Sequence, residues 1–505
     1  MKKGDAPVKE KKSILHYVTE TLCALFMILH YVAKTLYALF IIVVLLLFGF
    51  VFLFIPPGPD EDLSSYYKRT VLLGLGSLAL LVLLGIIVGV IVPKYQARIH
   101  TIEGRYEYAV QEDGTAMITK FTPRKEYDKP HTELIIPNKL DGHPVTGIGD
   151  GAFKDILEGG YRSKTMSVTI PDGVTSIGDN AFHGCYSLTS VIIPDGVTSI
   201  GNSAFEYCRS LMSVIIPDSV TSMGVNPFIN CDDLTQIIVS PDHPVFATID
   251  GVLFNKSEKK LVCYPHAFAQ TSYDIPDGIT SIGDYAFYDC YRLTSVIIPD
   301  GVTSIGNGAF SSCYRLTSVI IPDGVTSIGD SAFSSCRRLT SVIIPDGVTS
   351  IGNGAFYYCR RLTSVIIPDG VTSIENGAFS HCYSLTSVII PDGVTSIGDY
   401  AFSSCSSLTS VIIPDGVTSI GDSAFSFCYS LTSVIIPDGV TSIGSGAFSS
   451  CFSLTSVSLP DSVTSIGSEA GFVGQMERVT FTVPRGSWAE EWCKKNDWRY
   501  RYSEE

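Results

Sequence analysis

The sequence lacks the short motifs that indicate catalysis or zinc binding. None of its 14 cysteines has a Cys-x-x-Cys spacing, its nine histidines include no HExxH arrangement, and it has no G-x-S-x-G elbow. The nearest approach to that elbow, "GNSAF" at 201–205, ends in phenylalanine. The 45 glycines recur in turns and not in a phosphate-binding loop. These absences predict a noncatalytic protein without a metal or cofactor.

The greater part of the chain also lacks an excess of positive charge. Residues 1–105 carry 11 Lys and Arg against 7 Asp and Glu, a net charge of +4. The whole chain has 35 Lys and Arg and 50 Asp and Glu. The remainder therefore carries 24 basic residues against 43 acidic ones, a net charge of −19. Because an acidic surface repels a phosphate backbone, we expect no nucleic-acid partner.

Charge is missing altogether from two long apolar runs, residues 36–55 and 71–92. Each run is long enough to cross a hydrocarbon layer of ~30 Å at ~1.5 Å per residue. The pattern predicts a two-span transmembrane hairpin over residues 36–93, with the lipid bilayer as a partner. Residues 1–35 then form a basic tail and an amphipathic helix that lies in the membrane interface.

The sequence leaves open which side of the membrane would bear the rest of the chain. Basic residues lie before the first run and, as Lys94, Arg98 and Arg105, after the second. By the positive-inside tendency, two spans with both basic flanks inside would place the repeats in the cytoplasm. Insertion of residues 14–34 as a third span would reverse this orientation, although Glu20 and Lys34 make that costly.

Most of the chain repeats one 23-residue unit. The phrase [IL]-P-D-[GS]-[VI]-T-S-[IM] occurs twelve times, and from Pro276 to Pro460 its proline recurs every 23 residues without interruption. This period is typical of a solenoid. One coil buries too few apolar side chains to offset its conformational entropy, so the coils must stack. Identical coils then stack each side chain on the same residue type of the next coil, which gives ladders of Phe, Cys and Ile.

The copy that begins at Leu385 predicts the structure of one coil. Leu385, Val388 and Ile390 have the spacing of a short strand with one face in the core. The segment 391–393, Pro-Asp-Gly, is a turn in which glycine allows a positive φ. Val394 then begins a second apolar edge. The aspartate of this turn recurs in every coil and could bind Ca²⁺, but we favour a solvated turn because each copy supplies one carboxylate.

The cysteines follow the same period. Twelve lie between Cys185 and Cys451, and eleven of them share one position in the repeat. A disulfide framework normally has mixed spacings in a short chain. We therefore interpret these cysteines as small buried core residues and not as disulfides or metal ligands.

The unit "LTSVIIPDGVTSIGDYAFSSC" resembles the leucine-rich repeats of the BspA-like surface-protein family, over roughly residues 105–505. "LDGHPVTGIGDGAF" at 140–153 is similar to that family's opening repeat, and "VPRGSWAEEWCKKN" at 483–496 to its closing helix. The segment 245–265 resembles its longer variant repeat, which we expect to form a hairpin around Asn255 and Lys256. The resemblance implies a noncatalytic binding or adhesion protein, commonly at the cell surface.

Together these observations predict the fold class and the domains. We expect a leucine-rich repeat β-solenoid of 23-residue coils, preceded by an α-helical transmembrane hairpin. The expected parts after the hairpin are a linker and N-terminal cap repeat over 94–164, the solenoid over 165–469 with an irregular repeat at 240–270, and a C-terminal cap over 470–505.

The positions that differ between copies indicate where a partner binds. They cluster after the repeated cysteine, and in four consecutive copies they are Tyr and Arg. This Tyr/Arg edge comprises Tyr291, Arg292, Tyr314, Arg315, Arg337, Arg338, Arg360 and Arg361. Arg and Tyr are favoured anchors in interfaces, so the edge predicts binding of a protein or an anionic glycan. The alternatives are a structural spacer without a specific partner, and a Thr/Ser array that binds an ordered surface.

Overall fold

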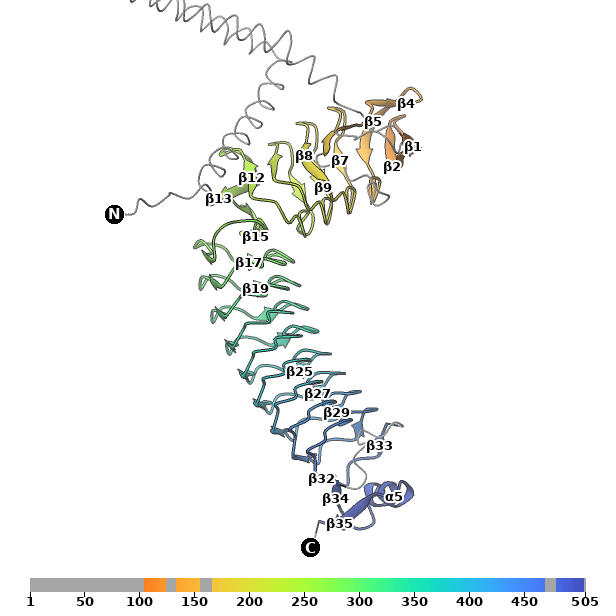
Figure 1. The fold of residues 1–505 in the computed structure, drawn as a ribbon, viewed down its shortest axis with the longest axis vertical. Helices are drawn as coiled ribbons and strands as arrows, with labels where there is room; N and C mark the ends of the chain where they lie inside the picture. Colours follow the sequence, from red (N-terminus) through yellow and green to blue (C-terminus); the bar gives the residue numbers. More distant parts are fainter. Residues whose placement is uncertain (1–103, 124–132, 155–165, 468–477, 504–505) are drawn as a thin grey trace, which may run out of the picture. The chain divides into compact units, whose positions relative to one another are not determined.

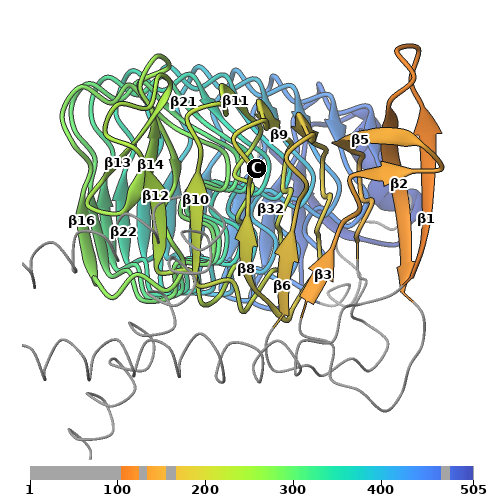
Figure 2. The ribbon, with the colours of Figure 1, turned by 90° about the horizontal axis from the view of Figure 1, so that it is seen from above.

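The computed structural model describes residues 104–123, 133–154, 166–467 and 478–503, which form a β-solenoid (Figure 1). Each regular coil contributes two short strands. In the coil that begins at Leu385 these are β26 (Ser387–Ile389) and β27 (Ser396–Ile397). Each strand pairs in parallel with the equivalent strand one coil away, residue for residue: Val388 lies opposite Val365 and Val411. The two sets of strands run as separate sheets along the stack (Figure 2).

The strands fall into four groups along the chain. The first group is β1 (Gly104–Val110), β2 (Ala116–Pro123), β3 (Glu133–Ile135), β4 (Lys139–Leu140), β5 (His143–Ile148), β6 (Met166–Thr169), β7 (Ser176–Ile177), β8 (Leu188–Ile192), β9 (Ser199–Ile200), β10 (Ser213–Ile216), β11 (Ser222–Met223) and β12 (Gln236–Val239). The irregular repeat contains β13 (Phe246–Ile249), β14 (Val252–Asn255) and β15 (Lys260–Cys263).

The regular coils supply the third group. Their first strands are β16 (Ser272–Asp274), β18 (Ser295–Ile297), β20 (Ser318–Ile320), β22 (Ser341–Ile343), β24 (Ser364–Ile366), β26, β28 (Ser410–Ile412), β30 (Ser433–Ile435) and β32 (Ser456–Ser458). Their second strands are β17 (Ser281–Ile282), β19 (Ser304–Ile305), β21 (Ser327–Ile328), β23 (Ser350–Ile351), β25 (Ser373–Ile374), β27, β29 (Ser419–Ile420), β31 (Ser442–Ile443) and β33 (Ser465–Ile466). The C-terminal group is β34 (Thr480–Val483), α5 (Trp488–Lys495) and β35 (Arg499–Tyr502).

The core is built from ladders of identical side chains, as the repeat predicts. From Phe287 to Phe448 the phenylalanines stack with ring centroids 4.8–5.5 Å apart and nearly parallel planes. Leu385, Val388 and Ile390 are all buried. The alternation of a strand therefore leaves Ile389, which lies between two inward residues, pointing away from the core.

The cysteine ladder confirms the structural interpretation of these residues. All 13 cysteines in the described part of the chain are free and buried. Except for Cys290, which donates to the Tyr288 carbonyl, each repeated Sγ donates to the carbonyl of the phenylalanine in the preceding coil, as Cys359 does to Phe333 at 3.2 Å. The thiol thus fills the core and links neighbouring coils through a weak hydrogen bond.

In the copy that begins at Leu385, the glycine of the Pro-Asp-Gly turn has a different role from the predicted one, whereas Gly278 at the same position of the first regular copy has the predicted positive φ, +87°. Gly393 does not adopt a positive φ; instead, a Cβ at this position would lie 2.8 Å from the Asp369 carbonyl oxygen of the preceding coil. Glycine avoids a side-chain clash at Gly393 because successive backbones approach closely there. Where serine replaces it, at Ser219, the hydroxyl donates to the Val197 carbonyl at 2.7 Å.

The irregular repeat divides the core into two clusters. β14 pairs antiparallel with both β13 and β15, so the hairpin expected around Asn255 and Lys256 is present as β14 and β15. Leu253 and Val262 face the N-terminal cluster, whereas Val252 and Leu261 face the C-terminal one. The second cluster continues to α5.

The predicted fold class needs a correction. The structure supports the β-solenoid, but within the described ranges no helix is long and apolar enough to cross a membrane. The transmembrane hairpin predicted over 36–93 lies outside the described residues, as do residues 1–35. The fold of the described residues is therefore the solenoid, and we withdraw the transmembrane hairpin from the fold class, together with the integral membrane localisation and the bilayer partner that depended on it.

Candidate binding surface

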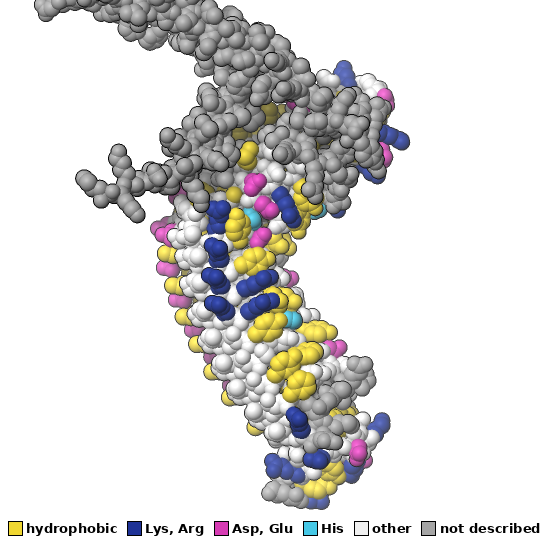
Figure 3. Space-filling model, in the orientation of Figure 1, with side chains coloured by type: hydrophobic (Ala, Val, Ile, Leu, Met, Phe, Trp, Pro, Cys, Tyr) yellow, Lys and Arg dark blue, Asp and Glu magenta, His cyan; other side chains and the backbone are white. Residues whose placement is uncertain are grey.

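The outer face of the first-strand sheet carries columns of identical side chains. In chain order across each of the four coils that carry the arginine, they are arginine, threonine, serine, isoleucine and aspartate, as in Arg315, Thr317, Ser318, Ile320 and Asp323. The later coils have serine at the arginine position. Parallel pairing in register repeats this order from coil to coil. Figure 3 shows the basic side chains facing the viewer and hydrophobic and acidic side chains alternating along one margin.

Three of these columns are named below. The arginine ladder is Arg292, Arg315, Arg338 and Arg361, all exposed. The isoleucine ladder is Ile297, Ile320, Ile343, Ile366, Ile389, Ile412 and Ile435, which are 60–74% exposed. The aspartate ladder is Asp300, Asp323, Asp346, Asp369, Asp392, Asp415 and Asp438, also exposed.

The structure places the eight residues of the Tyr/Arg edge on four successive coils, in two adjacent columns. The arginine ladder forms the column nearer the strands. Tyr291, Tyr314, Arg337 and Arg360 form the other, one residue earlier in each coil. Neighbouring coils are ~4.8 Å apart, so the four arginines of the ladder span roughly 14 Å.

The second column is organised by contacts between guanidinium groups and tyrosine rings. Cζ of Arg337 lies 4.5 Å from the ring centroid of Tyr314. Cζ of Arg360 lies 4.2 Å from that of Tyr358, and Arg360 also donates to the Tyr358 hydroxyl. That hydrogen bond lowers the pKa of the Tyr358 phenol. These contacts hold the second column in place beside the arginine ladder.

Sequence reasoning missed Tyr358, which belongs to this surface. Its ring also lies 5.5 Å from that of His381 and 6.0 Å from that of Tyr383. Tyr358 directly precedes the repeated cysteine and has φ +63, a conformation that a bulky side chain rarely adopts. Ser335 and Ser404 occupy the same position in other coils, also with positive φ. The signal in the sequence was therefore an aromatic residue where other copies have serine.

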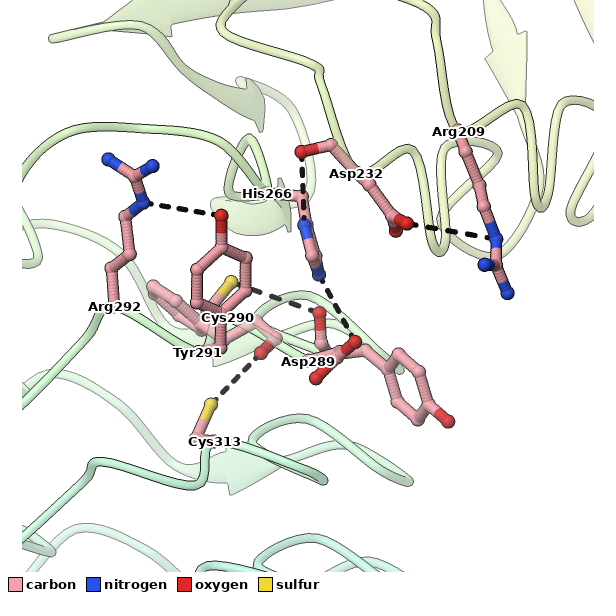
Figure 4. A network of polar contacts seen from close by, with 10 residues as sticks. Arg209, Asp232, His266, Asp289, Cys290, Tyr291, Arg292 and Cys313 are labelled. Carbon is pink, nitrogen blue, oxygen red and sulfur yellow. Dashed lines mark hydrogen bonds and ion pairs between the residues drawn. The ribbon is translucent and has the colours of Figure 1, made fainter. Parts of the chain in front are cut away.

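The arginines of the edge have no acidic partner among the described residues. Ion pairs in this part of the chain involve Arg209, Lys260, His266 and Lys494, and none involves the Tyr/Arg edge. Asp289, the acid nearest the edge in sequence, lies 3.3 Å from His266 Nε2 (Figure 4). The six arginines thus present uncompensated positive charge on a chain whose net charge is −15.

The structure offers no metal site in the ranges that it describes. No group of three or more His, Cys, Asp and Glu side chains there could hold an ion. The one Cys-x-x-His spacing joins Cys263 and His266, but Cys263 is buried in the N-terminal core cluster while His266 faces Asp289. The aspartate ladder places one carboxylate per coil on the surface.

The threonine columns connect coils through their hydroxyl groups. Thr386 Oγ1 donates to the Thr363 carbonyl at 3.2 Å, and Thr395 Oγ1 donates to the Thr372 carbonyl at 3.2 Å. The same bond recurs along both columns. A hydroxyl that makes this bond uses its hydrogen inside the solenoid, which leaves only its acceptor lone pairs for an external surface.

Two solved structures of leucine-rich proteins are similar to this chain. The chain is similar to a leucine-rich repeat protein from Bacteroides ovatus, with 26% identity, coverage of 79% of this chain and 98% of that chain, and a TM-score of 0.47. It is also similar to a leucine rich cell surface protein from Faecalibacterium prausnitzii, with 29% identity, coverage of 79% and 94%, and a TM-score of 0.44. No curated protein matches the chain.

The repeats themselves match a family model. The model of the BspA type leucine rich repeat region matches residues 146–269, 260–386 and 372–485, which together are more than half of the chain. This match confirms the resemblance seen in the repeat unit. The chain belongs to the family of BspA-type leucine-rich repeat proteins.

Proposed function

We propose that this chain is a noncatalytic binding or adhesion protein that binds an acidic partner, protein or anionic glycan, through the Tyr/Arg edge. The observation that carries the proposal is the arginine ladder: four exposed arginines in consecutive coils without an acidic partner in the described chain. Like charges ~4.8 Å apart repel, so the ladder is better explained by a ligand than by the stability of the fold.

The chemistry of the edge suits a carboxylate or sulfate-bearing partner. A guanidinium group presents forked donors that match the oxygens of such anions. The tyrosines beside the ladder offer flat amphipathic faces. Because attraction between exposed charges is screened, binding must weaken as salt is added.

Two defined probes test this proposal. Poly-glutamate and a sulfated glycan, each immobilised, should retain the full-length chain at low salt and release it at high salt. Replacing the arginine ladder by serine should weaken retention at least about tenfold, because four charge-assisted contacts are lost. Ser384 and Ser407 occupy the same position in later coils, so the fold tolerates serine there.

A matched control removes the same charge elsewhere. Lys120, Lys139, Lys154 and Lys259 are exposed and lie away from the edge, and their replacement by serine should leave retention unchanged. If both four-serine variants bind the probes equally, net charge alone governs binding and the edge is a solvated surface. That outcome would favour the structural spacer. Retention on a neutral crystalline surface, unaffected by salt, would favour the Thr/Ser array.

A further inference from the structure

The isoleucine ladder is the largest exposed apolar feature of the described sheet face. Seven isoleucines stand in consecutive coils, and Ile297 to Ile412 lie opposite one another in register. The ladder ends at polar residues on both sides, with Asp274 opposite Ile297 and Ser458 opposite Ile435. Contiguous exposed apolar surface of this kind indicates an interaction site.

The columns beside this ladder indicate the charge pattern that a partner covering it must match. The arginine ladder lies in the exposed turn before the strands and the aspartate ladder in the exposed turn after them, with the isoleucine ladder between. In each of four coils one arginine and one aspartate therefore flank the apolar column, as Arg315 and Asp323 flank Ile320. One margin of the face is positive and the opposite margin is negative.

Such a face is complementary to itself. A two-fold axis parallel to the stack keeps each coil at its own height and reverses the order of the columns across the face. Arg315 of one copy then faces Asp323 of the other, and the reverse pair forms at the other margin. A two-fold axis across the stack would instead place aspartate against aspartate, which is repulsive.

The coil spacing and the area of this face also favour a second copy of the chain as the partner that covers it. Both faces share one coil spacing, so a match at one coil is repeated at every coil. Seven coils span about 29 Å along the stack, and six extended residues span about 20 Å across it. Two such faces bury on the order of 1,200 Å², the lower end of the range for specific interfaces.

We infer that the acidic partner of the Tyr/Arg edge is a second copy of this chain, bound face to face across the first-strand sheet in a parallel, two-fold dimer. This inference rests on the proposed function, since it uses the arginine ladder. The isoleucine ladders and the serine columns are covered in the centre, and the arginine and aspartate ladders pair at both margins.

A charge-swap experiment on the full-length chain tests the dimer. One variant carries Arg292→Glu, Arg315→Glu, Arg338→Glu and Arg361→Glu, and a second carries Asp300→Arg, Asp323→Arg, Asp346→Arg and Asp369→Arg. Sedimentation velocity in a non-ionic detergent, which suppresses association through the uncharged runs 36–55 and 71–92, should give a salt-sensitive dimer for the wild type. Each variant should weaken the dimer at least about tenfold, because like charges then face each other.

The decisive comparison is whether dimerisation returns when both sets of substitutions are combined. A chain that carries both sets of substitutions should dimerise again, since glutamate then faces arginine. A mixture of the two single-set variants should form a mixed dimer. Circular dichroism must show an unchanged fold in every variant. Substitution of Ile320, Ile343 and Ile366 by threonine, which keeps the β-branched shape, should also weaken the dimer.

Three results would overturn the inference. They are a monomeric wild type at all concentrations, a dimer that resists both charge reversals, and a doubly substituted chain that stays monomeric while folded. The proposed function can survive this failure: if the chain is monomeric but its arginine ladder still retains it on poly-glutamate, the edge binds another acidic partner. If neither assay depends on the ladder, both proposals are wrong.

Discussion

We predict that the stability of the solenoid falls steeply at alkaline pH, because its thiols are buried. Burial raises the pKa of twelve thiols in the folded chain, to about 12 for Cys359 and Cys405, from a reference value of 9.0. Below pH 9 these thiols are neutral in both the folded and unfolded chain, and their contribution to stability is fully present. Above pH 9 the unfolded chain ionises while the folded chain does not, so stability is lost up to the folded pKa.

The number of thiols sets the size of this effect. One thiol lowers the free energy of unfolding by about 1.4 kcal/mol per pH unit in that window. Twelve therefore lower it by about 16 kcal/mol per pH unit once the unfolded thiols are ionised, which exceeds the total stability of many domains. We expect the solenoid to unfold within a narrow range above pH 9.

Urea unfolding followed by circular dichroism, at several pH values and with a reductant, measures the slope. A matched variant carries alanine at Cys336, Cys359, Cys382 and Cys405. Its tyrosines and lysines are unchanged, so its slope should be smaller than that of the wild type by about 5 kcal/mol per pH unit, the contribution of four thiols. An equal slope in the two proteins would show that the thiols are not the cause. Persistence of native structure well above pH 11 would contradict the burial argument itself.

Three further predictions concern the coils. Phe356 stacks between Phe333 and Phe379 at 5.4 Å from each ring, so Phe356→Ala should cost about 3–5 kcal/mol of unfolding free energy in urea titrations; a change below 1 kcal/mol would argue against the ladder. Gly393→Ala should destabilise by about 1–3 kcal/mol through contact with the Asp369 carbonyl, and Gly393→Ser by less, because its hydroxyl can donate as Ser219 does; equal losses would refute the role of that bond. The repeated thiols should react slowly with a thiol reagent until denaturant is added, and rapid labelling of most of them in the native chain would contradict their burial.

The sequence was sufficient to predict which side chains of one coil face the core, but not to predict the contacts between coils. Leu385, Val388 and Ile390 were assigned inward because their spacing is that of a strand with one buried face, and the structure agrees. The role of Gly393 was misjudged, because a close approach depends on the distance to the neighbouring coil, which no single repeat encodes. The hydrogen bonds of the threonine and cysteine columns were missed for the same reason.

The candidate surface was also only partly predictable. Variation between copies indicated the Tyr/Arg edge as a candidate, since positions that pack cannot vary freely; its role in binding stays a prediction. Tyr358 was overlooked because it contacts Arg360 of this surface from a backbone position with positive φ, which the sequence does not reveal. The outward direction of Ile389 follows from alternation, but in "SVII" two adjacent isoleucines hide which of them faces the core.

The parallel direction of the strands explains how a 23-residue repeat produces a face with positive charge at one margin and negative charge at the other. Four of the first strands, β18, β20, β22 and β24, are preceded by an arginine and followed by an aspartate, and all the strands of this sheet run in parallel. In an antiparallel sheet the two charges would alternate along each margin and largely cancel. Parallel stacking instead adds them into two ladders of opposite sign, with neighbours in each ladder repelling by up to about 1 kcal/mol in water. That repulsion is relieved when an opposite ladder of the same period lies across from it, and this chain carries such a ladder on its own opposite margin.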